Sequence, residues 1–177
     1  ATKDELKEMK KLACQMIEQG AFALTTGLSG PPSGYADTNE IIDLCSAISR
    51  YDNAFYATHA RVGPGRHKSA IEESVRIGTK SEIPVQFSHL SITEISLHGR
   101  SAESLKIFEN AYESGLDISY DVYPYTAAGA GLKQVIPGWA QAGTREEYML
   151  RLSDPSTREI IKSEVVTGIR EKPPRWA

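Results

Sequence analysis

The sequence contains no hydrophobic run long enough to cross a membrane and no excess of positive charge. No apolar stretch approaches the roughly 20 residues that a transmembrane helix needs. Against 23 acidic residues stand 20 Lys and Arg, which gives a net charge of −3. A chain of this charge has no basic field that attracts nucleic acid or an anionic membrane surface. We therefore expect partners of neither kind.

Cysteine is scarce, because the chain carries only Cys14 and Cys45. Each falls within a helical pattern, and neither belongs to a closely spaced pair. We interpret both as buried free thiols, not as a disulfide or metal ligands. Free thiols are typical of a reducing compartment, so we predict a cytoplasmic protein.

Several familiar functional motifs are also missing. The Gly- and Pro-rich segment 27–34 has neither the G-x-x-x-x-G-K nor the G-x-G-x-x-G spacing that cradles phosphate groups. This argues against nucleotide binding. The chain also lacks the G-x-S-x-G elbow of serine hydrolases and the H-E-x-x-H motif of zinc proteases.

Helical and strand patterns alternate along most of the chain. Helices should begin near Thr2 and Asp37, each of which is followed by a glutamate three residues later. This alternation predicts an α/β fold with a parallel sheet and outer helices, either doubly wound or part of a (β/α)8 barrel. A complete barrel takes about 250 residues, so 177 residues supply only a partial one. The four expected strands are 21–26, 53–59, 84–90 and 116–123.

The alternation stops near residue 143. Thr144 and Glu147 have the spacing of a capping box, and Asp154 precedes a proline suited to a first helical position. We predict two polar helices, at 145–152 and 155–167, followed by a linker. The expected domains are therefore a partial barrel, 1–143, and a helical insertion with a truncated linker, 144–177.

Two histidines occupy equivalent places in successive units. His59 ends the second expected strand and His89 lies at the end of the third, 30 residues later (89 − 59). Parallel strands bring these ends to the same edge of the sheet, so the two imidazoles should lie close together. Neutral imidazole is a good zinc ligand. The pair is therefore a candidate metal site, although such spacing also arises without a metal.

Other polar residues lie near the same edge. Arg61 has the chemistry to bind a substrate carboxylate, or it pairs with a neighbouring acid at the surface. Tyr123 and Tyr125 are able to donate to a substrate carbonyl or carboxylate, or they pack the rim of the barrel. Asp121 is placed to hydrogen-bond one of the histidines. The other two histidines, His67 and His98, are expected to be solvated.

Four stretches together resemble the N-acyl-D-amino-acid deacylases, or D-aminoacylases, of the amidohydrolase superfamily. They occur in the order and at the approximate spacing found in that family. The resemblance implies a metal-dependent (β/α)8 barrel that hydrolyses the amide bond of small N-acyl-D-amino acids. The four stretches are Thr25–Thr38, Tyr56–Arg61, Pro84–Leu90 and Asp121–Ala127.

The resemblance also implies roles for single residues. His59 and His89 match the two histidines that bind the more firmly held zinc ion. Arg61 matches an arginine just past the first of them, and Tyr123 matches a tyrosine near the substrate carboxylate. The helices after residue 144 are similar to a helical insertion of the family.

The chain departs from the family at some positions. Ser29-Gly30 stand where the family usually has an aromatic residue before Pro-Pro-Gly, and Ser91 stands where it has a lysine. The first-strand His-x-His, the bridging ligand and the aspartate that acts as general base are expected outside residues 1–177. No catalytic residue is therefore assigned within the chain, and we expect it to be inactive alone.

Two other interpretations remain open. One is a different amidohydrolase, similar to the dihydroorotases or hydantoinases, although these usually bridge two metals with a carboxylated lysine. No lysine here lies at a convincing strand end. The other is a non-catalytic binding or assembly domain. Four strands leave two open sheet edges, through which a homo-oligomer would form.

Overall fold

The computed structural model describes residues 1–30, 32–63, 65–126, 129 and 131–171. They form two compact units, with the boundary between Tyr123 and Pro124. The division expected from the sequence, at 143–144, falls within the second unit. The tail 172–177, expected to be a linker, lies outside the described residues.

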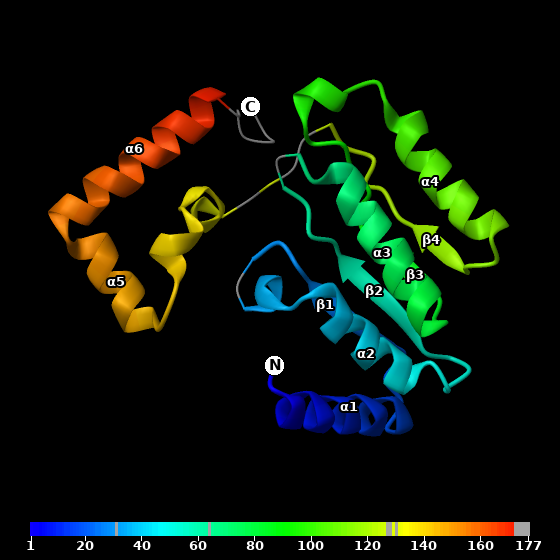
Figure 1. Ribbon diagram of the computed structural model, residues 1–177. Helices are drawn as coiled ribbons and strands as arrows, with labels where there is room; N and C mark the ends of the chain where they lie inside the picture. Colours follow the sequence, from blue (N-terminus) through cyan, green and yellow to red (C-terminus); the bar gives the residue numbers. More distant parts are fainter. Residues whose placement is uncertain (31, 64, 127–128, 130, 172–177) are drawn as a thin grey trace. The chain divides into compact units, whose positions relative to one another are not determined.

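The first unit is built on a four-stranded parallel sheet (Figure 1). The strands follow the order β1-β2-β3-β4, and each pairs in parallel with the next. The expected α/β fold is confirmed, because four sequential parallel strands with helices between them match part of a (β/α)8 barrel. The strands are β1 Ala23–Gly27, β2 Phe55–His59, β3 Val85–Phe87 and β4 Ile118–Tyr120.

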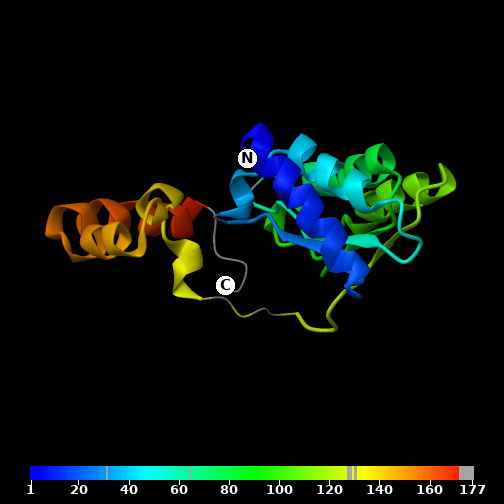
Figure 2. The ribbon, with the colours of Figure 1, turned by 90° about the horizontal axis from the view of Figure 1, so that it is seen from below.

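One helix precedes each strand, and successive helices pack against one another. All four lie on the same face of the sheet, as the two ribbon views agree (Figures 1 and 2). The predicted capping box of Thr2 and Glu5 is present, and the Asp37 side chain accepts from the backbone N–H of Glu40. The helices are α1 Lys3–Glu18, α2 Thr38–Ile48, α3 His67–Ser81 and α4 Ser101–Glu113.

The two faces of the sheet differ in chemistry. Alternate strand residues point to opposite faces. One set is buried and mostly apolar, and it includes Tyr56, Val85 and Phe87. The other set is small or polar apart from Phe55, with Ala57 and Gln86 neighbouring each other across β2 and β3. The sheet therefore places its core on one face and carries polar groups on the other.

The buried face includes a satisfied polar cluster. The Tyr56 hydroxyl lies 2.6 Å from the Thr26 hydroxyl, which lies 2.9 Å from that of Thr58. Burial raises the pKa of Tyr56 to about 12, partly offset by its threonine hydrogen bonds. The phenol therefore stays neutral and serves to align β1 with β2.

Close packing between α3 and the sheet depends on Gly78. A Cβ at this position would lie 2.5 Å from Cγ2 of Val85 and 2.8 Å from Cδ1 of Leu116. Both distances are far below normal contact, and both neighbours belong to the core or pack against it. A residue without a side chain is thus required where the helix meets β3.

The second unit is helical. Two 3-10 turns, η3 Leu132–Val135 and η4 Gly138–Gln141, precede α5 Arg145–Ser153 and α6 Pro155–Glu171. The predicted capping box at Thr144 and Glu147 is present. Arg151 donates to the backbone carbonyls of Ala140 and Ala142, which holds η4 against α5. No helix among the described residues is long and apolar enough to span a membrane.

We expect Gly78→Ala to destabilise the chain, although alanine normally stabilises a helix relative to glycine. The added methyl group should cost about 1–3 kcal/mol of unfolding free energy, because it forces Val85 and Leu116 aside. Thermal and urea unfolding measure the change. Thr79→Ala, an exposed position on the same helix, is the control and should be neutral or slightly stabilising. Equal or higher stability of Gly78→Ala would show that the close approach is not limiting.

Candidate metal centre

His59 and His89 lie side by side at the carboxyl end of the sheet. His59 is the last residue of β2, and His89 follows the end of β3 by two residues. Nδ1 of His59 is 2.7 Å from Nε2 of His89, and the ring centroids are 4.5 Å apart in an edge-to-face arrangement. The predicted proximity of the two imidazoles is confirmed. Their role as metal ligands stays a prediction.

The backbone of His89 adopts an unusual conformation. Its φ of 42° lies in the left-handed region, which costs a non-glycine residue on the order of 1 kcal/mol. The backbone N–H of His89 donates to Oδ1 of Asp121 at 2.7 Å. The second carboxylate oxygen of Asp121 accepts from Nε2 of Gln86 at 2.9 Å. This carboxylate therefore supports the strained turn that directs the His89 ring toward His59.

Asp121 itself is held in place by the sheet. Its backbone N–H donates to the carbonyl of Phe87, and its carbonyl accepts from the N–H of Leu90. The sequence predicted that Asp121 bonds one of the histidines. The bond exists, but it reaches the main chain of His89 and not its ring.

Ser29 is a member of the site that sequence reasoning missed. Its hydroxyl lies 2.7 Å from Nε2 of His59, on the opposite side of the ring from His89. The sequence signalled Ser29 only as a departure from the family pattern. Both ring nitrogens of His59 therefore have a hydrogen-bond partner, and the orientation of the ring is fixed from two sides.

The donor set suits a metal ion such as zinc. Zn–N bonds of about 2.0–2.1 Å in tetrahedral geometry place two nitrogens about 3.4 Å apart. The 2.7 Å separation seen here needs only a small opening of the rings. Among the described residues, no group of three or more His, Cys, Asp and Glu side chains gathers as a metal site. Within the described part of the chain, the site therefore brings together two candidate ligands.

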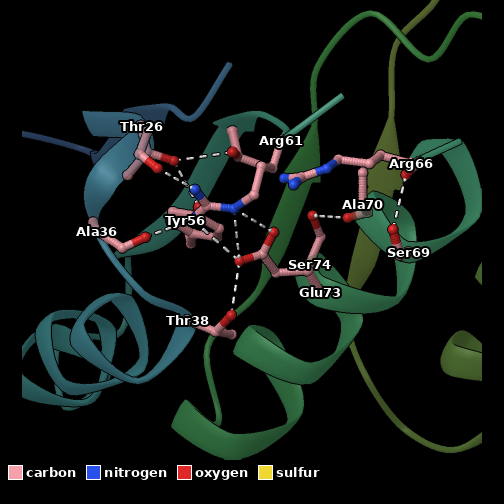
Figure 3. A network of polar contacts seen from close by, with 12 residues as sticks. Thr26, Ala36, Thr38, Tyr56, Arg61, Arg66, Ser69, Ala70, Glu73 and Ser74 are labelled. Atoms are coloured by element: carbon pink, nitrogen blue, oxygen red, sulfur yellow. Dashed lines mark hydrogen bonds and ion pairs between the residues drawn. The ribbon is translucent and has the colours of Figure 1, made fainter. Parts of the chain in front are cut away.

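Arg61 is engaged by protein groups (Figure 3). Its Nε pairs with Oε2 of Glu73 at 3.2 Å, and its terminal nitrogens donate to the carbonyls of Gly34 and Ala36, each at 2.6 Å. This is the neighbouring-acid alternative raised by the sequence. Substrate binding by Arg61 stays a prediction.

The two tyrosines follow β4. Tyr123 is half-buried at the end of the first unit, whereas Tyr125 is 73% exposed and belongs to the second. The side chain of Tyr125 is therefore open to solvent and does not pack a core. Their roles in substrate binding stay predictions.

His67 and His98 behave differently from each other. His98 is exposed, as predicted. The prediction for His67 is wrong, because it is the first residue of α3 and only 9% exposed, with Nε2 2.7 Å from the Ser104 hydroxyl. Burial lowers the pKa of His67, which favours the neutral ring. It bridges α3 to α4 and has a structural role.

The two cysteines are free thiols, as predicted. Cys45 is fully buried, and this burial raises its pKa to about 12. Cys14 is half-buried and donates to the carbonyl of Ala47. Neither thiol contributes to the histidine pair, and the cytoplasmic location stays a prediction.

About three quarters of this chain is similar in sequence or structure to known proteins. No protein-family model matches the chain. A D-aminoacylase of Alcaligenes xylosoxydans xylosoxydans is 39% identical over 135 residues, which are 76% of this chain and 27% of that protein. Among solved structures, a D-aminoacylase described as defining a novel subset of amidohydrolases matches with a TM-score of 0.67 at 38% identity. That match covers 72% of this chain and 27% of the other.

A second solved structure carries a metal. It is an N-acyl-D-glutamate deacylase from Bordetella bronchiseptica in complex with zinc and a phosphonate inhibitor that mimics the tetrahedral intermediate. The TM-score is 0.68 at 26% identity, over 71% of this chain and 26% of that one. The chain thus spans about a quarter of the length of the relatives that it matches.

We expect Asp121→Ala to loosen the backbone at His89, because it removes the acceptor of the His89 N–H. A hydrogen bond to a charged group contributes about 1.5–3 kcal/mol, so amide exchange at His89 should become about 10- to 100-fold faster. Hydrogen exchange followed by NMR measures this. Asp117→Ala, an exposed aspartate before the start of β4, is the control. Unchanged protection of His89 would rule out the supporting role of Asp121.

Proposed function

We propose, from the premise that this chain is a homologue of one segment of the N-acyl-D-amino-acid deacylase family, that it forms part of a zinc-dependent amidohydrolase. The reaction is hydrolysis of the amide bond of an N-acyl-D-amino acid. The family resemblance inferred from four sequence stretches is confirmed by relatives at 38–39% identity. The chain covers about a quarter of those proteins, so we assign the proposed activity to a complete barrel that contains such a segment and not to the segment alone.

The observation that carries the proposal is the pair of imidazole nitrogens 2.7 Å apart at the carboxyl ends of β2 and β3. In (β/α)8 enzymes, catalytic groups gather at the carboxyl ends of the strands. The zinc-bound deacylase of similar fold supports the choice of metal. His59 and His89 would hold the ion as neutral ligands.

The proposed role of each residue follows from this arrangement. When bound, zinc would polarise the scissile carbonyl and lower the pKa of a water molecule towards about 7. His59 and His89 would bind the ion, while Ser29 holds the ring of His59 and Asp121 holds the backbone of His89. Tyr123 would donate to the substrate carboxylate near the strand ends. A carboxylate outside the described residues would move the proton from water to the leaving amine.

The two outer strands of the sheet are relevant to the alternative that the chain is a binding or assembly domain. Among the residues that the structure describes, β1 and β4 each pair on one side only. Exposed apolar side chains lie beside them, with Phe22 74% and Val122 61% exposed. We infer that further strands of the same barrel cover these edges, which unites the enzyme and assembly interpretations. A homo-oligomer formed through the edges stays a prediction, which sedimentation at increasing concentration would test.

Zinc should bind the 177-residue chain at one site that needs both histidines. His59→Ala and His89→Ala should each weaken zinc binding by about tenfold or more, since each removes one of two protein ligands. Isothermal titration at neutral pH measures the affinity. His98→Ala, which changes an exposed histidine, is the matched control and should bind zinc as the native chain does. Equal zinc affinity in all four proteins would contradict the metal site.

The chain alone should not turn over N-acyl-D-amino acids, because two histidines do not complete the metal site and no general base is assigned to it. The complete enzyme should hydrolyse N-acetyl derivatives of several D-amino acids, and His89→Ala in that enzyme should abolish the activity. Release of free amine is the readout, with the corresponding L-isomers as the specificity control. Clear turnover by the purified 177-residue chain would overturn this view of the site.

A further inference from the structure

The guanidinium of Arg61 lies among four acceptors that all belong to the protein. Nε and one terminal nitrogen approach the Glu73 carboxylate at 3.2–3.4 Å, and the terminal nitrogens reach two backbone carbonyls at 2.6 Å. Only 19% of the Arg61 side chain and 13% of that of Glu73 are exposed. All three nitrogens have a partner, so the cation has little capacity left for a substrate carboxylate.

These contacts join four separate elements (Figure 3). Arg61 lies just past the end of β2, and Glu73 belongs to α3. Glu73 also accepts from the hydroxyl of Thr38, the first residue of α2, at 2.8 Å. The two carbonyls, of Gly34 and Ala36, come from the connection between β1 and α2. The ion pair therefore anchors this connection to the helical layer.

The same connection carries Ser29. Leu28 anchors its beginning, because its side chain is 3% exposed and its backbone N–H donates to the carbonyl of His59. Arg61 anchors its end through Gly34 and Ala36. Between these two anchors the Ser29 hydroxyl lies against Nε2 of His59.

We propose that Arg61 is a positioning residue of the histidine pair and not the anchor of a substrate carboxylate. It holds the connection between β1 and α2 so that Ser29 fixes the imidazole of His59. The expected change in zinc affinity rests on the function proposed above. The expected change in the orientation of the His59 ring does not, so the two can be tested separately.

The first test uses the 177-residue chain without metal. Glu73→Gln removes the charge that holds the guanidinium, and Arg61→Lys keeps a positive charge but loses the planar fork that reaches several acceptors at once. Both should shift the 15N resonances of the His59 ring and speed amide exchange at Gly34 and Ala36. Arg76→Gln, an exposed arginine of α3 that contacts Asn39, is the matched control and should change neither. Circular dichroism verifies that each variant is folded.

The second test asks whether Arg61 acts through Ser29. Ser29→Ala and Glu73→Gln should each lower zinc affinity, by about tenfold, as loss of a supporting hydrogen bond to a metal ligand commonly does. The double variant should bind zinc no more weakly than Ser29→Ala alone, because both changes remove the same support. Losses that simply add would show that Glu73 acts by another route and would overturn the proposal.

Kinetics of the complete enzyme separate the two roles of Arg61. If Arg61 is a positioning residue, Glu73→Gln should lower kcat. The freed guanidinium should not improve substrate binding, so KM should not fall. A substrate anchor predicts that Arg61→Lys raises KM alone, with native His59 resonances and native zinc affinity. That second pattern would refute our inference. If the native chain fails to bind zinc, the metal proposal falls, and the metal-free resonances of His59 still decide the role of Arg61.

Discussion

Parallel pairing of β2 with β3 is the constraint on which the candidate site depends. The register sets Thr58 beside Phe87, so the chain leaves both strands at the same edge of the sheet. His59 and His89 emerge there although 30 residues separate them. The pairing in turn needs α3 to cross back closely over the sheet, which Gly78 permits. Helix packing and the placement of the two histidines are thus linked through one structural unit.

Each histidine is supported by a different neighbour of its strand. His59 is held from the β1 side by Ser29, whereas His89 is held from the β4 side by Asp121. The two supports share no residue, and one is a hydroxyl on a ring while the other is a carboxylate on a backbone N–H. The two rings are thus supported independently from opposite sides, and they also contact each other directly, with Nδ1 of His59 2.7 Å from Nε2 of His89.

Much of this arrangement follows from sequence pattern. Helical caps at Thr2, Asp37 and Thr144 are local signals, because capping involves residues three positions apart. The meeting of the histidines follows from the geometry of a β-α-β unit. The contact of Ser29 with His59 and the burial of His67 against Ser104 do not, since both depend on how distant loops and helices pack. The sequence also does not indicate the left-handed backbone at His89, because histidine, unlike glycine, is not typical of a positive φ.

That turn has a consequence for any redesign of the proposed metal site. A φ of 42° is tolerated by asparagine, aspartate and glycine, but it is costly for β-branched or bulky residues. Exchange of the proposed ligand at position 89 is therefore limited to short oxygen donors, which favour harder cations than zinc. Position 59 ends a regular strand and accepts a wider choice, including sulfur donors. The two halves of the pair thus differ in how far their chemistry can be altered without loss of the backbone that presents them.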